Sequence, residues 1–249
     1  MSGDMSGDMS GDMSGDMSGD MSGDMSGDMS GDMSGDMKIK SALLSGVFLV
    51  SVFILSAEVL SLAAPAVVKT IPQSEWNSGG VEPVAGKLFP HGNGITSLVL
   101  HHTQTPNEAP AMEKARLRSI RRYHMVEKEW GEVAYHYFIG SSGQVYEGRD
   151  WRFAGDSGTT YDLNGRLLIC LLGDFSEAMP TEKALESMLD LVAAKLHEHK
   201  LTPSDVVTHQ MVAATDCPGA AMQKWFEEEG KPAIARQFEG KEINSAKLE

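Results

Sequence analysis

Basic charge and cysteine are both scarce in this sequence of 249 residues. Lys and Arg number 21 against 35 Asp and Glu, so there is no basic excess for nucleic acid, and we expect no nucleic-acid partner. With only two cysteines, Cys170 and Cys217, the chain can form at most one internal disulfide. Cys170 lies in the apolar run RLLICLLG, which predicts a small buried side chain. A Cys170–Cys217 bridge stays open as the alternative.

The first 36 residues have no aliphatic face, because they are nine copies of Met-Ser-Gly-Asp. Such a tract cannot bury enough apolar surface to offset the entropy of an ordered chain, so we expect it to be disordered. It carries nine of the 35 acidic residues, and without them the formal charge is 21 − 26 = −5 instead of −14. The acidity of the chain is therefore mostly a property of this repeat, which takes no part in the predicted fold.

Residues 37–66 have the three parts of a secretory signal peptide, because Lys38 and Lys40 precede a long apolar run and small residues follow it. An uncleaved membrane anchor is the alternative, although Glu58 interrupts the apolar segment. Nine acidic residues upstream oppose the basic start of a signal peptide, so we expect translation to begin at Met37 and interpret the repeat as a start-site artefact or a slippage-prone extension. The protein is then exported to the periplasm or the extracellular space and contacts a membrane only through this segment.

The rest of the chain predicts a single α/β domain with a central mixed β-sheet flanked by helices. Apolar runs rich in β-branched residues predict strands, and apolar residues at helical spacing predict amphipathic helices. The predicted strands are 94–102, 133–140, 144–148, 166–173 and 205–209, and the predicted helices are 110–130, 181–200 and 218–231. The domain is assigned to residues 95–235, preceded by an N-terminal arm at 67–94 and followed by a frayed polar tail at 236–249. We expect it to be a monomer.

Three side chains of the kinds that bind zinc lie at the ends of predicted strands or in the loop after one. His101 and His209 each lie at the end of a strand, and Cys217 follows His209 by eight residues. Two histidines and one cysteine would leave the fourth position of a tetrahedral zinc ion open, as in catalytic sites. The spacing of eight alone is not specific, so Cys217 could also be a buried apolar side chain or half of a disulfide.

Three segments resemble, in the right order, the peptidoglycan recognition proteins and the related zinc amidases of the N-acetylmuramoyl-L-alanine amidase type 2 family. They are LVLHHTQTP, RRYHMVEKEWGEVAYHYFIGSSGQVYEGRDW and THQMVAATDCPG, and the similarity extends from about Ile95 to Phe226. The resemblance implies an α/β domain with one Zn²⁺ per chain in a surface groove, held by His101, His209 and Cys217. Non-catalytic receptors of the family typically have serine in place of this cysteine, so its presence favours an enzyme.

The resemblance also implies the reaction. Zinc lowers the pKa of its bound water to about 7 and polarises an amide carbonyl. Tyr135 matches a family tyrosine that points at the metal, and Thr215 matches a position that holds threonine in animal amidases. Both are candidate catalytic residues that stabilise the oxyanion or position the water. The implied partner is peptidoglycan, cleaved at the amide between N-acetylmuramic acid and L-alanine.

Two segments depart from the family pattern. GRDWRFAGDSG lacks the histidine that relatives have after the tryptophan, and Leu167-Leu168-Ile169 replaces Ser-Ile-Gly. Both segments border the binding groove in relatives, so the substrate-binding residues are not assigned. A non-catalytic peptidoglycan-binding receptor or scaffold is therefore the alternative function.

The other histidines near the predicted site are interpreted as structural or solvent-exposed residues, and the alternation of side chains along a strand predicts which way two tyrosines face. His102 should face away from His101 on an extended chain and form structural hydrogen bonds. His124 and His136 are predicted to be hydrogen-bonded histidines of the core, and His91, in the turn FPHGNG, is predicted to be exposed to solvent. Alternation also predicts that Tyr135 and Tyr137 share one face of a strand, with His136 on the other.

Overall fold

The computed structural model describes residues 68–78 and 80–246, and the surroundings of side chains up to residue 240. The predicted repeat at 1–36 and the predicted signal peptide at 37–66 lie outside the described residues. Within the described part of the chain, none of the helices combines the length and the apolar character needed to cross a membrane.

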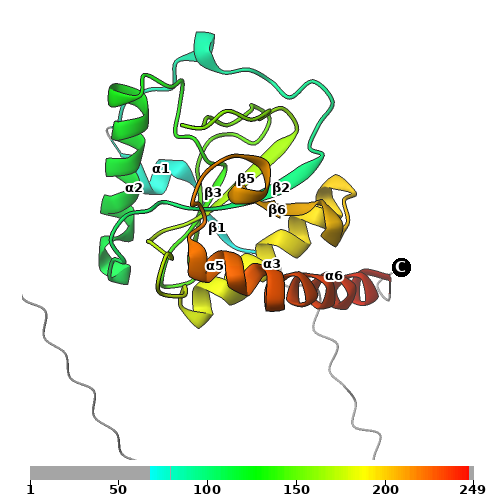
Figure 1. Ribbon diagram of the computed structural model, residues 1–249. Coiled ribbons are helices and arrows are strands. Elements are labelled where there is room, and N and C mark those ends of the chain that lie inside the picture. Colours follow the sequence, from blue (N-terminus) through cyan, green and yellow to red (C-terminus); the bar gives the residue numbers. More distant parts are fainter. Residues whose placement is uncertain (1–67, 79, 247–249) are drawn as a thin grey trace, which may run out of the picture. The chain divides into compact units, whose positions relative to one another are not determined.

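A mixed sheet of six strands forms the centre of the described domain (Figure 1). The strands are β1 (Thr70–Ile71), β2 (Ser97–His102), β3 (Tyr137–Ile139), β4 (Val145–Glu147), β5 (Arg166–Leu171) and β6 (Val206–Thr208). Their order across the sheet is β1-β4-β3-β5-β2-β6. β3 and β4 are antiparallel, and the other neighbouring pairs are parallel. The predicted α/β domain with a mixed sheet is confirmed.

The two longest strands, β2 and β5, lie side by side, and neither is an edge strand of the sheet. Every residue of β2 is buried, and β5 is buried after its first residue. Strands covered on both faces are continuous apolar runs instead of alternating ones, which explains the sequence pattern. Successive residues enter two different core clusters. Leu98 and Ile169 pack in the cluster that includes Met188, whereas Cys170 packs in the cluster that includes Leu117.

Helices cover both faces of this sheet (Figure 1). The helices are α1 (Gln73–Trp76), α2 (Glu113–Arg122), α3 (Glu182–His199), α4 (His209–Val212), α5 (Ala220–Trp225) and α6 (Lys231–Ala246). Apolar residues of α3, α5 and α6 join one core cluster, and those of α1 and α2 join the other. α3 begins after Thr181, whose Oγ1 accepts the N–H of Ala184 over 3.2 Å and so caps the first turn.

Two segments predicted to lie outside the domain contribute to its structure. The predicted arm supplies β1 and the fully buried Trp76, whose Nε1 donates to the carbonyl oxygen of Glu147 over 2.8 Å. The predicted frayed tail from Arg236 is instead helical, because α6 continues to Ala246. Ile234 and Phe238 lie one turn apart on this helix and both pack on the core that α3 covers.

Two buried charged side chains tie α2 to neighbouring loops. Glu113 is 1% exposed and accepts hydrogen bonds from Ser142 and from the hydroxyl of Tyr146. Arg121 forms a bidentate ion pair with Glu132, with N–O distances of 2.6 and 2.7 Å.

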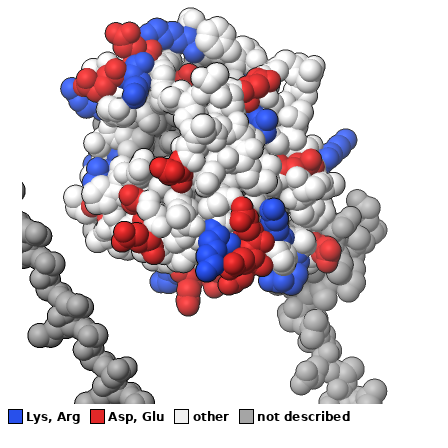
Figure 2. Space-filling view, in the orientation of Figure 1, with Lys and Arg blue, Asp and Glu red and all other residues white. Residues whose placement is uncertain are grey.

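On the surface, acidic and basic side chains lie next to one another on the face seen in Figure 2.

Candidate metal centre

Three potential metal ligands meet at the carboxyl ends of β2 and β6. His101 is the residue before the last one of β2, His209 is the first residue of α4 directly after β6, and Cys217 lies in the loop before α5. Leu100 pairs with Thr208 in these neighbouring parallel strands, so the residues that follow each of them come side by side. One ligand atom from each of the three side chains lies within 4.8 Å of the other two.

The spacing of one pair of these atoms matches that of ligands on a tetrahedral zinc ion. Sγ of Cys217 lies 3.6 Å from Nδ1 of His101, and the ring centroids of His101 and His209 are 4.5 Å apart. Zinc bonds of about 2.1 Å to nitrogen and about 2.3 Å to sulfur place tetrahedral ligands roughly 3.5 Å apart. Nε2 of His101 is buried and has no hydrogen-bond partner among the described residues, so the polar atoms of this ring are not satisfied by the described protein groups alone.

Burial sets the protonation of the three ligands. It lowers the pKa of His101 well below the ordinary value and lowers the pKa of His209 to about 4, so both rings are neutral near pH 7 and offer a lone pair. Burial also raises the pKa of Cys217 to about 12, so its thiol keeps its proton until a cation replaces it. The N–H of His102 donates to Sγ of Cys217 over 3.4 Å, which favours the thiolate.

Tyr135 lies beside the ligands, but its orientation differs from the predicted one. Its ring centroid is 5.1 Å from that of His101, and it packs edge-on against Phe138 at 5.5 Å, on the sheet face that α2 covers. Tyr137 belongs to the opposite core cluster, where Nζ of Lys195 lies 4.8 Å from its ring centroid. The predicted shared face of Tyr135 and Tyr137 is wrong, because alternation applies only within an extended strand and β3 begins at Tyr137.

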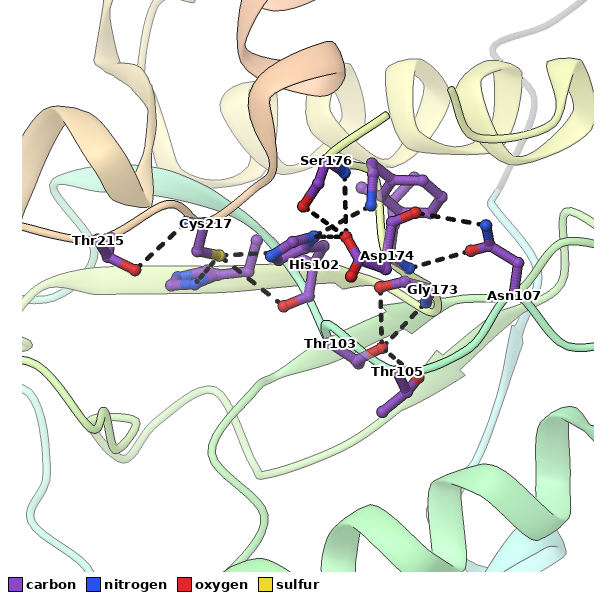
Figure 3. A network of polar contacts seen from close by, with 12 residues as sticks. His102, Thr103, Thr105, Asn107, Gly173, Asp174, Ser176, Thr215 and Cys217 are labelled. Atoms are coloured by element: carbon purple, nitrogen blue, oxygen red, sulfur yellow. Dashed lines mark hydrogen bonds and ion pairs between the residues drawn. The ribbon is translucent and has the colours of Figure 1, made fainter. Parts of the chain in front are cut away.

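Thr215 supports the loop that carries Cys217 (Figure 3). Its Oγ1 accepts the N–H of Cys217 over 3.2 Å, a local turn in which a side chain binds the backbone two residues on. The hydroxyl hydrogen of Thr215 remains available to a further acceptor. The structure therefore brings this predicted catalytic residue next to the ligands, with its oxygen already engaged in the loop.

His102 holds the end of β2 in place from the side of the sheet opposite to His101. Its Nδ1 accepts the N–H of Phe175 over 3.3 Å and lies 3.8 Å from a carboxylate oxygen of Asp174 (Figure 3). Beyond it, Oγ1 of Thr103 accepts the N–H of Gly173 over 2.9 Å. The prediction that His102 forms structural hydrogen bonds is confirmed, and these contacts fix the backbone that carries His101.

The other neighbouring histidines make backbone hydrogen bonds. His124 and His136 are buried and hydrogen-bonded, which confirms their prediction as core histidines. The prediction that His91 is exposed is wrong, because its Nδ1 accepts the N–H of Gly165 over 2.8 Å and its ring is half-buried. A loop distant in the sequence thus folds over the turn that contains His91.

Neither cysteine forms a disulfide. Cys170 is fully buried in the core cluster against which Tyr135 packs, as predicted for a small apolar side chain. The alternative of a Cys170–Cys217 bridge is therefore wrong, and the partly exposed thiol of Cys217 is free to bind a metal.

No sequence signal identifies Thr159 and Tyr161, yet both contact a potential ligand. Oγ1 of Thr159 lies 2.7 Å from Nε2 of His209. The ring of Tyr161 lies 5.1 Å from that of His209, and its buried hydroxyl has no hydrogen-bond partner among the described residues. Both residues follow the segment GRDWRFAGDSG, and loops carry no periodicity from which such contacts could be predicted.

Known proteins resemble this chain in sequence and in fold. The N-acetylmuramoyl-L-alanine amidase family matches residues 91–220, which include all three potential ligands. N-acetylmuramoyl-L-alanine amidase of the pig, Sus scrofa, is 31% identical over 182 residues, which make up 68% of this chain and 30% of that protein. The chain thus spans less than a third of the length of this relative.

Two solved structures show the same fold. Peptidoglycan recognition protein SD of Drosophila superposes with a TM-score of 0.59 and 26% identity, covering 65% of this chain and 95% of that one. Human PGRP-IBETAC, solved in complex with glycosamyl muramyl pentapeptide, superposes with a TM-score of 0.57 and 25% identity, covering 64% of this chain and 95% of that one.

Proposed function

The chain belongs to the N-acetylmuramoyl-L-alanine amidase family, and we propose that it is a zinc-dependent amidase that cleaves between N-acetylmuramic acid and L-alanine in peptidoglycan. The observation that carries this proposal is the convergence of His101, His209 and Cys217, whose ligand atoms lie within 4.8 Å of one another. A zinc site with three protein ligands keeps one position open for water or substrate, which is the arrangement of a catalytic site. Binding of a sugar–peptide polymer alone requires no such set of ligands.

The ligand set suits one zinc ion per chain. When bound, zinc supplies a water of pKa near 7 and a Lewis acid for the amide carbonyl. His101 and His209 are neutral for this purpose, and the N–H of His102 supports the negative charge that Cys217 must carry. Contacts of His102 and Thr215 hold the backbone on both sides of the site, so the backbone that carries the ligands is supported before the metal binds.

Tyr135 is the residue that we assign to the developing oxyanion. Burial raises the pKa of its hydroxyl well above the ordinary value, so the hydroxyl keeps its hydrogen and can donate it. The ring packs against His101 and Phe138, with centroid distances of 5.1 and 5.5 Å, which restricts where the hydroxyl can point. A donor held in place before the reaction stabilises the transition state without further reorganisation.

Thr215 is assigned a second, supporting role. Its oxygen holds the N–H of Cys217, and its hydroxyl hydrogen is left for the substrate or for a water molecule. Thr215 would thus contact both the backbone of the thiolate ligand and the amide of the substrate or its attacking water.

Peptidoglycan as the substrate is supported by the relatives. Human PGRP-IBETAC was solved with a muramyl pentapeptide, and the pig relative carries the name of an amidase that acts on the same linkage. Peptidoglycan lies outside the cytoplasmic membrane, and the three-part pattern of residues 37–66 supports export to that compartment.

A soluble N-acetylmuramoyl-L-alanyl peptide tests the proposal without an insoluble polymer. The zinc-loaded full-length chain is expected to release the peptide, a chelator to stop the release, and added zinc to restore it. Binding of the muramyl peptide at full zinc occupancy without release would instead support the non-catalytic receptor.

A further inference from the structure

We propose that Thr159 is a positioning residue that orients the imidazole of His209 for metal binding. The inference rests on the zinc site proposed above and adds a residue outside the ligand set. Oγ1 of Thr159 lies 2.7 Å from Nε2 of His209, although 50 positions separate the two residues. The loop between β4 and β5 therefore reaches the site without supplying a ligand itself.

This contact decides which nitrogen of His209 faces the metal. With Nε2 engaged by Thr159, Nδ1 is the nitrogen left to offer a lone pair. A neutral imidazole has one N–H and one bare nitrogen, so a metal on Nδ1 requires the hydrogen on Nε2, which then donates it to Oγ1 of Thr159. Nδ1 is also the atom of His101 that lies 3.6 Å from Sγ of Cys217. Both rings thus present the same nitrogen to the metal.

Thr159 is in turn held by its own loop. Its hydroxyl lies 2.9 Å from Oγ of Ser157, and that Oγ accepts the N–H of Thr159 over 3.1 Å. Once Oγ1 of Thr159 accepts the hydrogen of His209, the hydroxyl of Thr159 donates its own hydrogen to Oγ of Ser157. The ring of Tyr161 packs against the imidazole, with centroids 5.1 Å apart. These contacts restrict rotation of His209 before any metal binds.

Zinc affinity measures this role directly, because loss of an outer partner typically weakens metal binding by about 10–100-fold. In the full-length chain, Thr159→Val removes the acceptor and keeps the shape, so we expect a weakening of that size in competition with a chromophoric chelator. Thr159→Ser keeps the hydroxyl and should bind zinc within about twofold of the parent. Thr160→Val, at the exposed neighbouring position, is the matched control and should leave the affinity unchanged.

A second readout needs neither metal nor activity. Long-range nitrogen–proton NMR of the zinc-free full-length chain should show His209 with its hydrogen on Nε2 and Nδ1 bare. Equal zinc affinity of Thr159→Val and the parent, or a parent His209 with its hydrogen on Nδ1, would overturn the inference. If Thr159→Val does not fold, the tautomer of the parent decides the question. Tight zinc binding without amide cleavage would refute the proposed function and leave this inference standing.

Discussion

Sγ of Cys217 lies 3.6 Å from Nδ1 of His101, although 116 positions separate the two residues. Parallel pairing of β2 with β6 brings the histidines together, and the loop stabilised by Thr215 returns the cysteine to them. Both side chains are neutral near pH 7, so without a metal they gain only a weak thiol–imidazole hydrogen bond from each other. The arrangement is the one expected if both side chains bind the proposed zinc ion.

Replacement of Cys217 by serine is expected to abolish zinc binding at neutral pH, because a hydroxyl is far harder to deprotonate than a thiol. The loss of affinity should exceed the roughly 10–100-fold that removal of an outer partner costs. Metal analysis after dialysis should find one zinc per parent chain and little in the variant. Cys170→Ala, which removes the other thiol, should keep its zinc, and stoichiometric zinc in Cys217→Ser would contradict the ligand assignment.

Tyr135→Phe removes a hydroxyl and keeps the ring that contacts His101. We expect kcat to fall by about 10²–10³-fold with little change in zinc content, as for the loss of one fixed oxyanion donor. The matched control is Tyr137→Phe, because that ring faces α3 on the other side of the sheet. Steady-state kinetics on a muramyl peptide would count against the role of Tyr135 if both variants retained the parental kcat.

His136 is expected to stay neutral well into the acid range. Burial lowers its folded-state pKa from 6.5 to about 3, and both ring nitrogens are hydrogen-bonded to backbone groups. The unfolded chain binds the proton below pH 6.5 and the folded chain does not. The contribution of neutral His136 to the free energy of unfolding is therefore complete above pH 6.5. It decreases by about 1.4 kcal/mol per pH unit as the pH falls towards 3. NMR of the assigned ring should show no titration between pH 7.5 and about 5, and a midpoint near 6.5 would contradict the buried neutral ring.

Arg121→Met should destabilise the domain by about 3–5 kcal/mol, because it leaves the carboxylate of Glu132 buried without its cation. Urea unfolding measures this cost. Arg152→Met breaks the pair with Asp150 at a side chain that is 71% exposed, and should leave the free energy of unfolding almost unchanged. Equal costs for the two variants would show that burial of the Arg121–Glu132 pair is not what makes it important.

The strands and helices were predictable where one periodic pattern ran over several residues. β2 and β5 are buried on both faces and therefore stand out as apolar runs, and α3 shows Met188, Val192 and Leu196 at helical spacing. Trp76 and β1 were not predictable, because the two residues of β1 are too short a run to show a period. The helical course of α6 past Arg236 depends on Phe238 packing on the core, which a polar local composition conceals.

The potential ligands were predictable from motifs, whereas their surroundings were not. His101, His209 and Cys217 lie in segments whose residue order resembles a known family, so their convergence could be expected. The orientation of Tyr135 depends on where β3 begins, and one residue of difference moves a side chain to the other face of the sheet. The contact of Thr159 with His209 arises between a loop and a helix start that only the tertiary fold brings together.

The central claim is that this chain uses the three ligands to hydrolyse the amide of peptidoglycan. The most direct measurement incubates the zinc-loaded full-length chain and its Cys217→Ser variant with purified peptidoglycan, followed by mass spectrometry of the soluble products. The account predicts stem peptides with a free L-alanine amino terminus from the parent, and none from the variant or in the presence of a chelator. Absence of these peptides, while the parent still binds zinc and the polymer, would contradict the amidase and favour a receptor.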